Sequence, residues 1–249
     1  MNAEVPWYER AFDAPYLEVY GHRDAAEAET ATTHLLAPLS LEGRRVLDLA
    51  CGAGRYSAAV ARRGAAVVGL DLSPALLAAA QRDAPDLLGL VRGHMLRLPF
   101  APGCFDLVLC MFTSFGYMES AAADRSVLGE IQRVLRPQGQ LVLDLFNATS
   151  LRRNLVAETT RRAGPYEVRE RRRLDAAGVV VKEIELRAGG RVHRYRESVR
   201  LWPRESLLAA LRAAGLEPRQ LWGGYDATAY ESTTSPRLVV LADAVGGPR

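Results

Sequence analysis

The sequence predicts an α/β fold in which a mostly parallel sheet carries helices on both faces, with an antiparallel β meander inserted late in the chain. Two patterns support this. Between residues 46 and 146, apolar strand-like runs alternate with helix-like segments, as in repeated β-α units. Between residues 166 and 201, polar and apolar residues alternate, which is typical of an antiparallel sheet with one face in water.

The parallel part is predicted element by element. Ser73 followed by Pro74 is a helix start, because serine caps the first turn and proline fits the first helical position. The run FDLVLCMF is apolar almost throughout, as expected for a strand buried on both faces. The expected strands begin at Val46 and cover Ala66–Leu70, Leu87–Arg92, Phe105–Phe112 and Gln140–Phe146, and the expected helices cover Ser57–Arg63, Pro74–Asp83 and Ala122–Leu135.

The later part changes period. Three alternating segments are expected at Tyr166–Leu174, Val179–Arg187 and Val192–Leu201, separated by turns at Ala177-Gly178 and Gly189-Gly190. A helix at Pro203–Ala214, closed by Gly215, and an apolar strand at Arg237–Ala242 follow. Because the meander interrupts the α/β pattern late, we expect it to lie over the ligand end of the sheet.

The segment VLDLACGAGRY, residues 46–56, predicts a nucleotide-type ligand site. Gly52 and Gly54 interrupt the loop after the first strand, and Asp71 ends the second strand, where a pair of ribose hydroxyls would arrive. Asp48 stands before the loop, where a dinucleotide fold prefers glycine, and this favours a ligand with an ammonium and a carboxylate over a pyrophosphate. The alternative is a purely structural turn, since glycine alone is a weak signal.

These residues belong to a longer series of motifs, VLDLACGAGRYS, VVGLDLSPALLAAA, GHMLRLPF, FDLVLCMFTSFGYME and VLRPQGQLVLDL. In this order and spacing the sequence resembles the class I S-adenosylmethionine-dependent methyltransferases, and the tail YESTTSPRLVVLADA is similar to a bacterial small-molecule subgroup. The resemblance implies a Rossmann-like, seven-stranded sheet whose last strand, Arg237–Ala242, is antiparallel. It also implies S-adenosylmethionine as cofactor, S-adenosylhomocysteine as product, and no metal.

The resemblance also assigns cofactor contacts. Asp48 would anchor the glycine loop, Asp71 would accept the ribose hydroxyls, and the carbonyl of Cys110 or Met111 would lie near the ammonium group. The family usually has aspartate at the position of His94; a neutral histidine can still accept a hydrogen bond from the adenine amino group. The remaining implied contacts are the backbone of Ala50, Cys51, Gly52 and Gly54 around the methionine part, and Leu72, Met95 and Leu96 on adenine.

The N-terminal aromatic residues fall at helical spacing, so core packing is their default interpretation. Similar enzymes fold this segment over the cofactor, and on that basis Tyr16 and Tyr20 are expected near the sulfonium and Arg23 near its carboxylate. Tyr20 and Tyr117 are the catalytic candidates. The acceptor-side candidates are Asn147, Arg196 and Tyr225, together with Tyr230, Arg194 and Tyr195.

The expected organisation is a single methyltransferase domain over residues 1–249. Its parts would be an N-terminal helical lid at 1–40, a cofactor-binding core at 41–146, an antiparallel insertion on the substrate side at 147–202, and a C-terminal helix with the last strands at 203–249. The expected reaction moves a methyl group to a nitrogen or oxygen atom of a small metabolite. The alternatives are an RNA methyltransferase, a catalytically silent S-adenosylmethionine-binding protein and, more distantly, a nicotinamide oxidoreductase.

Composition limits the partners. Hydrophobic residues make up 49% of the chain, yet no apolar run is long enough to span a bilayer, and the first residues lack a secretion pattern. Three cysteines without metal-ligand spacing indicate free, buried thiols in a reducing compartment, hence a cytoplasmic location. The net charge is +3, and glutamates interleave the arginine-rich stretch 152–173, so a solvated face is favoured over nucleic-acid binding. We expect a monomer or homodimer that takes a small-molecule acceptor.

Overall fold

A computed structural model describes residues 5–12, 16, 17, 19 and 25–246. Within them the main sheet has seven strands in the order β10-β11-β5-β4-β1-β2-β3. Strand β11 runs antiparallel to both β5 and β10, whereas the pairings among β5, β4, β1, β2 and β3 are parallel. The strands are β1 (Arg45–Leu49), β2 (Ala66–Asp71), β3 (Gly89–Arg92), β4 (Phe105–Cys110), β5 (Leu135–Phe146), β10 (Leu216–Trp222) and β11 (Arg237–Ala244). The predicted fold class is confirmed.

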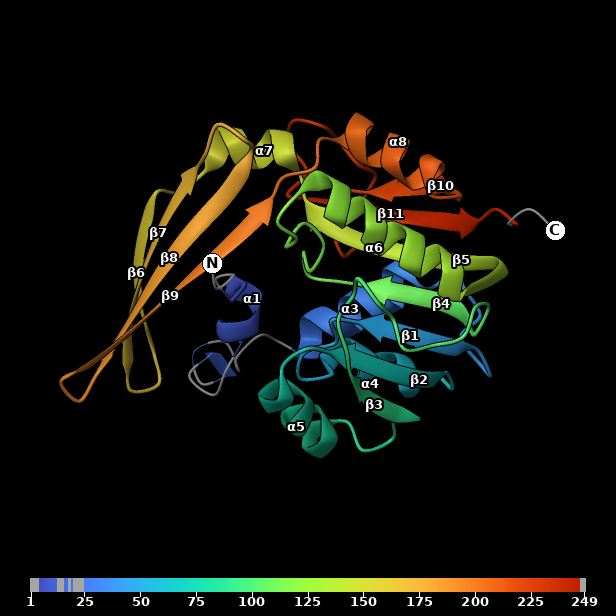
Figure 1. Ribbon diagram of the computed structural model, residues 1–249, viewed down its shortest axis with the longest axis horizontal. Helices are drawn as coiled ribbons and strands as arrows, with labels where there is room; N and C mark the ends of the chain where they lie inside the picture. The colour runs from blue at the N-terminus through green and yellow to red at the C-terminus, as the bar shows by residue number, and fades with distance from the viewer. Residues whose placement is uncertain (1–4, 13–15, 18, 20–24, 247–249) are drawn as a thin grey trace.

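Helices cover both faces of this sheet (Figure 1). Apolar side chains of α6 and α8 join one core cluster with alternate residues of β1, β4 and β5, and those of α3 and α4 join a second cluster on the opposite face. Strand β4 supplies both clusters, Val108 to the first and Leu107 to the second, as a doubly buried strand must. The helices are α1 (Trp7–Arg10), α3 (Ala25–Leu35), α4 (Arg55–Ala61), α5 (Pro74–Asp83), α6 (Ala121–Val134), α7 (Ala148–Asn154) and α8 (Arg204–Ala213).

Local signals explain where these helices begin. Ser73 caps α5 by accepting a hydrogen bond from the Leu76 N–H (3.2 Å), and Ser120 caps α6 by accepting from the Ala123 N–H (3.1 Å). Helix α5 has the predicted bounds. Helix α4 begins at Arg55, two residues before the predicted Ser57, because the left-handed Gly54 already occupies the cap position.

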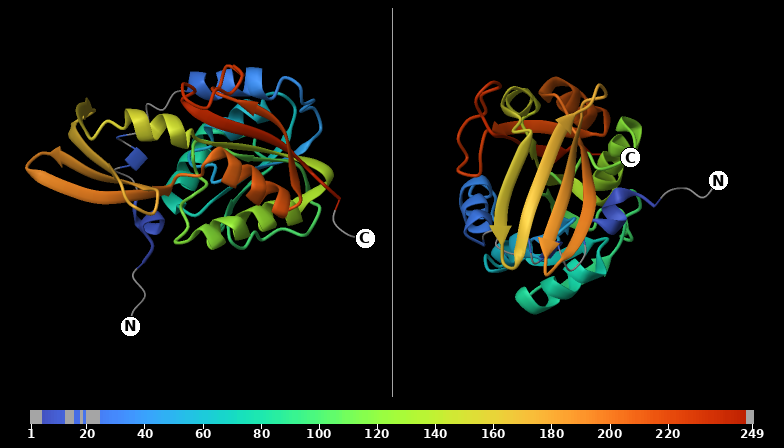
Figure 2. Two further views of the ribbon diagram at one scale, coloured as in Figure 1. Left: turned by 90° about the horizontal axis from the view of Figure 1, so that it is seen from above. Right: turned by 90° about the vertical axis from the view of Figure 1, so that its left-hand side faces the viewer.

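A second sheet stands at one end of the main sheet, with α1 between the two (Figures 1 and 2). It is an antiparallel meander of β6 (Glu158–Ala163), β7 (Tyr166–Leu174), β8 (Val179–Ala188) and β9 (Arg191–Arg200). The sequence predicts the last three strands and both turns. It misses β6, because the residues ETTRRA show no apolar alternation; none of them is fully buried. It also misses the short helix α7.

The described residues contain no helix that is both long enough and apolar enough to cross a membrane. The three cysteines are free; Cys51 and Cys110 are buried, whereas Cys104 is only partly buried, contrary to expectation. Helix α1 contacts β9, so the N-terminal segment lies against the meander.

Candidate functional site

A cavity of about 690 Å³ opens between the ends of β1, β2 and β4, the N-terminal segment and the inner face of the meander. Its first wall is the loop after β1. Ala50, Gly52 and Gly54 all adopt the left-handed region, with φ of 60°, 56° and 81°. The Cys51 N–H donates to the Leu70 carbonyl (3.0 Å), which ties this loop to β2. The loop therefore presents backbone rather than side chains to a ligand.

Asp71 lies at the end of β2, with its carboxylate fixed at the cavity wall. One oxygen accepts from the Gly52 N–H (2.9 Å) and the other from the Ser73 N–H (2.8 Å). The residue is 7% exposed, and burial raises the pKa of its carboxyl group. An oriented acid at this point suits the binding of adjacent hydroxyl groups.

Asp48 is buried beneath the glycine loop. Its carboxylate accepts a hydrogen bond from the Ser57 hydroxyl (2.5 Å), which fixes the first turn of α4 against β1. Burial raises the pKa of Asp48 to about 6, and the nearby charge of Asp71 adds to this effect. Asp48 also lines the cavity, so its ionised form would favour a cationic ligand.

Leu72, His94 and Met95 line the wall where adenine is expected, but Leu96 does not. The Leu96 side chain is exposed, and its N–H donates to Nδ1 of His94 (3.1 Å). Neutral His94 therefore carries its hydrogen on Nε2, which lies 3.4 Å from the Tyr8 hydroxyl. In this arrangement Nε2 is a donor, whereas the predicted contact with the adenine amino group requires an acceptor.

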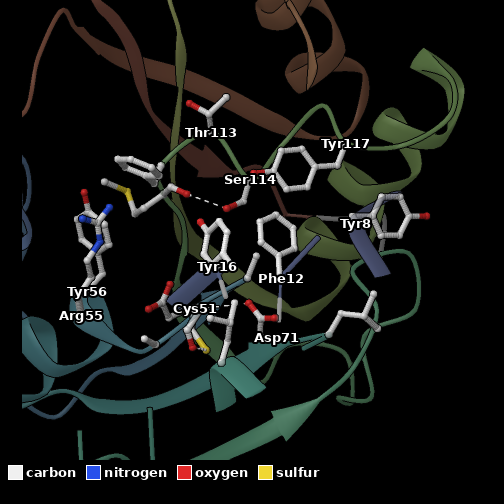
Figure 3. A pocket seen from close by; sticks show the side chains of 18 of the residues that line it. Tyr8, Phe12, Tyr16, Cys51, Arg55, Tyr56, Asp71, Thr113, Ser114 and Tyr117 are labelled. Atoms are coloured by element: carbon white, nitrogen blue, oxygen red, sulfur yellow. Dashed lines mark hydrogen bonds between the residues drawn. The ribbon is translucent and has the colours of Figure 1, made fainter. Parts of the chain in front are cut away.

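Aromatic rings from the N-terminal segment close another side of the cavity (Figure 3). The ring of Phe12 lies 4.9 Å from that of Tyr16 and 6.0 Å from that of Tyr117, and the ring of Trp7 lies 4.8 Å from that of Tyr117. The Ser73 hydroxyl donates to the Phe12 carbonyl (2.5 Å), which attaches this segment just beyond Asp71. Tyr20 and Arg23 lie outside the described residues.

The turn after β4 contains two consecutive non-glycine residues in the left-handed region, Phe112 (φ 58°) and Thr113 (φ 60°). Such strain persists only when the surroundings hold it in place. Here Asp144 accepts from the Phe112 N–H through its carboxylate (2.7 Å) and from the Thr113 N–H through its carbonyl (3.0 Å). The preceding Met111 carbonyl, expected near the ammonium group, accepts from the Ser114 hydroxyl (2.9 Å; Figure 3).

Two of the acceptor-side candidates lie outside the cavity lining. The amide of Asn147, which is 1% exposed, donates to the Ser232 and Ser235 carbonyls (3.0 and 2.8 Å), so it holds the loop before β11. The Tyr225 hydroxyl donates to Asp144 (2.7 Å). Burial raises the pKa of Tyr225, which makes it a poor base. Both residues have structural contacts in place of the expected acceptor contact.

Arg196, the third candidate, is exposed on the outer face of the meander. Because side chains alternate along a strand, its neighbours Tyr195 and Glu197 lie on the inner face. The meander residues that line the cavity are Arg172, Val180, Lys182, Glu197 and Val199. The sequence analysis missed them, although the alternation around Tyr195 carried the signal.

Arg55 is a further cavity residue that the sequence analysis did not single out. Its guanidinium lies 4.4 Å from the ring centroid of Phe112 and pairs with Glu27 (3.1 Å). As the first residue of α4 it places a cation beside the glycine loop, where a ligand carboxylate would be stabilised.

The predicted cofactor residues therefore meet in one place. Those that line the cavity are Tyr16, Asp48, Ala50, Cys51, Gly52, Gly54, Asp71, Leu72, His94, Met95 and Met111, together with the catalytic candidate Tyr117. A backbone loop, a buried acid at the end of β2, apolar walls and a cation fit the carboxylate, ammonium, ribose and adenine of an adenosyl amino acid. Among the described residues, no group of three or more His, Cys, Asp or Glu side chains is placed to hold a metal ion.

Comparison with known proteins agrees with this geometry. Residues 46–139 match the family described as the methyltransferase domain. A demethylmenaquinone methyltransferase of Clavibacter sepedonicus is 34% identical over 200 residues, which cover 78% of this chain and 74% of that protein.

Solved structures share the fold at low sequence identity. The CcbJ methyltransferase of Streptomyces caelestis superposes with a TM-score of 0.81 at 18% identity, covering 98% of this chain and all of that one. The sugar N-methyltransferase KedS8 of Streptoalloteichus superposes with a TM-score of 0.75 at 23% identity, covering 99% and 98% of the two chains.

Proposed function

Since the chain belongs to the class I S-adenosylmethionine-dependent methyltransferases, we propose that it methylates a nitrogen or oxygen atom of a small polar metabolite. The observation that carries this proposal is the continuity of one cavity from the glycine loop and Asp71 to the charged inner face of the meander. Such a cavity can hold a cofactor and an acceptor side by side, with the end of β4 between them.

On the cofactor side, Asp71 would hold the ribose hydroxyls and Arg55 the methionine carboxylate, with Asp48 supporting the loop from beneath. His94 would donate from Nε2, which suits a ring nitrogen of adenine better than its amino group. The aromatic residues Phe12, Tyr16 and Tyr117 would form a weakly polar wall beside the sulfonium.

When bound, S-adenosylmethionine supplies an activated methyl group for in-line displacement by the acceptor. The chain then has to align the acceptor and exclude water, which contributes most of the rate in such transfers. We propose that the N-terminal segment, tied down through Ser73 and Phe12, is the lid that excludes water. Tyr117 lies at the cavity beside this segment and remains our catalytic candidate, with Tyr20.

The relatives suggest a second candidate acceptor. The related protein of Clavibacter sepedonicus is named for a demethylmenaquinone substrate, and the aromatic wall of Phe12, Tyr16 and Tyr117 offers a surface for a flat ring. The inner face of the meander favours the polar acceptor, because Arg172, Lys182 and Glu197 would lose water against an isoprenoid chain.

The arginine-rich stretch gives little support to an RNA acceptor. On the outer face of the meander, Glu158 pairs with Arg169 and Arg171, and Glu185 pairs with Arg187 and Arg194. Carboxylates placed among these arginines weaken the attraction for phosphates. A cytoplasmic location and a monomeric or dimeric state complete the proposal.

The test has two steps. Calorimetry should show binding of S-adenosylmethionine and S-adenosylhomocysteine, and incubation with methyl-labelled cofactor and a bacterial metabolite extract should give labelled, water-soluble products by mass spectrometry. Binding without transfer to any metabolite would favour the catalytically silent alternative. Absence of binding to both compounds would overturn the cofactor assignment.

A further inference from the structure

An opposite-charge pair faces the acceptor end of the cavity. Lys182 on β8 and Glu197 on β9 are directly opposite one another in the sheet register, with the Lys182 Nζ 2.7 Å from the Glu197 Oε2. Their side chains are 16% and 15% exposed, and both line the cavity. The next rung of the same face, Val180 opposite Val199, also lines the cavity and is apolar.

Two further charged residues, Glu170 and Arg172, lie on the same face of the sheet and interact with each other. Glu170, which is 5% exposed, pairs with Arg172 and lies 3.8 Å from Lys182, and it also accepts from the Thr159 hydroxyl (3.2 Å). Arg172 in turn donates to the Thr159 hydroxyl (3.0 Å). Glu170 is therefore held from several sides by the sheet itself.

Glu197 is held differently. Within the described part of the chain, its carboxylate pairs with Lys182 through Oε2. An ionised carboxylate has about four acceptor positions, so Oε1 can accept further hydrogen bonds at the cavity surface. A partly buried ion pair costs desolvation energy and contributes little to stability. The Glu197–Lys182 pair is therefore better explained by ligand binding than by a contribution to stability.

We propose that Glu197 and Lys182 form the acceptor-recognition pair, binding two adjacent polar groups of the acceptor. One group, an amine or hydroxyl, donates to Glu197, and its neighbour accepts from Lys182. This inference rests on the proposed function and names its acceptor class as an amino alcohol or vicinal diol. It excludes a hydrocarbon-rich acceptor, because apolar contact would remove water from both charges without replacing their hydrogen bonds.

The experiment compares variants by initial rates with methyl-labelled cofactor and a dilution series of bacterial metabolite extract. Glu197→Gln keeps the shape of the side chain and removes its charge. It should lower the apparent kcat/KM by about tenfold or more, mainly through KM, because one charge-assisted hydrogen bond contributes about 1.5–3 kcal/mol. The matched control is Glu185→Gln on the outer face of the same sheet, which should keep the wild-type rate.

A double variant, Lys182→Glu with Glu197→Lys, retains the ion pair but exchanges the positions of donor and acceptor. Because Lys182→Glu brings a carboxylate next to the buried Glu170, this variant should melt below the wild-type temperature. At a temperature where it is folded, it should lose about tenfold or more in kcat/KM. S-adenosylhomocysteine affinity, measured by calorimetry, should be unchanged in every variant. This separates acceptor recognition from loss of fold.

The outcomes are distinct. Wild-type rates for both Glu197→Gln and the exchanged pair would overturn the inference and leave the proposed function intact. Labelled products that partition into heptane would also overturn it. If the wild-type protein binds cofactor but labels nothing in the extract, the proposed function fails, and this inference fails with it.

Discussion

Arg237 on β11 binds Asp144 on β5 through two parallel hydrogen bonds, Nε to Oδ1 at 2.8 Å and Nη2 to Oδ2 at 2.7 Å. Asp144 is fully buried and also holds the Phe112 N–H, while Arg237 donates to the Thr113 hydroxyl (2.7 Å). The antiparallel last strand thus fixes the strained turn at Phe112 and Thr113, which lines the cavity.

Replacing Arg237 with Gln should therefore destabilise the protein by about 3–5 kcal/mol, because it leaves a buried carboxylate without its partner. The matched control is Arg219→Gln on β10, whose partner Asp243 lies in a much more exposed pair; this should cost less than about 1 kcal/mol. Urea unfolding measures both variants. Similar losses for the two variants would contradict the role given to Arg237.

The glycine loop contains an alanine that is strained. Ala50 has φ of 60°, a conformation that costs an L-residue about 1–2 kcal/mol. Ala50→Gly should remove this cost but lose about 0.4–1 kcal/mol through the more flexible unfolded chain. We expect a net stabilisation of about 0.5–1 kcal/mol in urea unfolding. Ala53→Gly in the same loop, where φ is negative, should destabilise instead. If Ala50→Gly also destabilises, the strain is not real.

Asp71 is the residue on which we expect cofactor binding to depend most. Asp71→Asn keeps the size of the side chain but removes its charge. Loss of charge-assisted hydrogen bonds to ribose should weaken S-adenosylhomocysteine binding by about 100-fold, roughly 3 kcal/mol. Asp86→Asn, an exposed control in the α5–β3 connection, should bind like wild type. Calorimetry on both variants tests this, with melting temperatures to show that each is folded. Equal affinities would place the ribose elsewhere.

The sequence could predict that the proposed cofactor residues line one cavity, because they lie within short motifs at the ends of parallel strands. The glycines directly follow β1 and Asp71 ends β2, so their positions depend on these two strands and not on distant parts of the chain. The meander side of the cavity depends on which face of that sheet turns inward. Arg196 and Glu197 are neighbours in sequence but lie on opposite faces, and only the placement of the whole sheet decides between them.

The roles of polar residues near strand ends were also hard to predict from the sequence. Asn147 and Tyr225 follow strands in the way that site residues do, yet their hydrogen bonds go to backbone carbonyls and to Asp144. The sequence does not distinguish a buried structural amide from one that faces a ligand. Strand β6 was missed for a related reason, since its residues are at most partly buried and show no apolar period.

Asp48 should make stability depend on pH in an unusual direction. Its pKa is about 6 in the folded protein against 3.8 ordinarily, so between these values the folded state keeps a proton that the unfolded chain has released. The free energy of unfolding therefore falls as pH rises through this window, by up to about 3 kcal/mol. Asp48→Asn removes this contribution. Urea unfolding at pH 4 and pH 7 measures the free energy of unfolding of both proteins. Relative to the variant, the wild type should be less stable at pH 7 than at pH 4. A difference that is constant with pH would contradict the prediction.

Gly116 joins the Tyr117 loop to the strand that carries Glu197. Its carbonyl accepts from the Arg200 N–H (2.8 Å), its φ is 98°, and a Cβ there would lie 2.7 Å from the Arg200 carbonyl oxygen. Gly116→Ala should therefore destabilise the protein by about 2–3 kcal/mol, through both strain and the displacement of β9. The matched control is Gly129→Ala, in an open position of α6, which should stabilise by about 1 kcal/mol.

The same substitution should reduce methyl transfer to the acceptor much more than it weakens cofactor binding. Because Gly116 contacts the base of the meander rather than the glycine loop, Gly116→Ala should reduce methyl transfer about tenfold or more while S-adenosylhomocysteine affinity changes by less than about threefold. Calorimetry and labelled transfer, both at a temperature where the variant is folded, measure the two effects. Equal losses in both assays would mean that the joint between β9 and the core supports the whole cavity rather than its acceptor side.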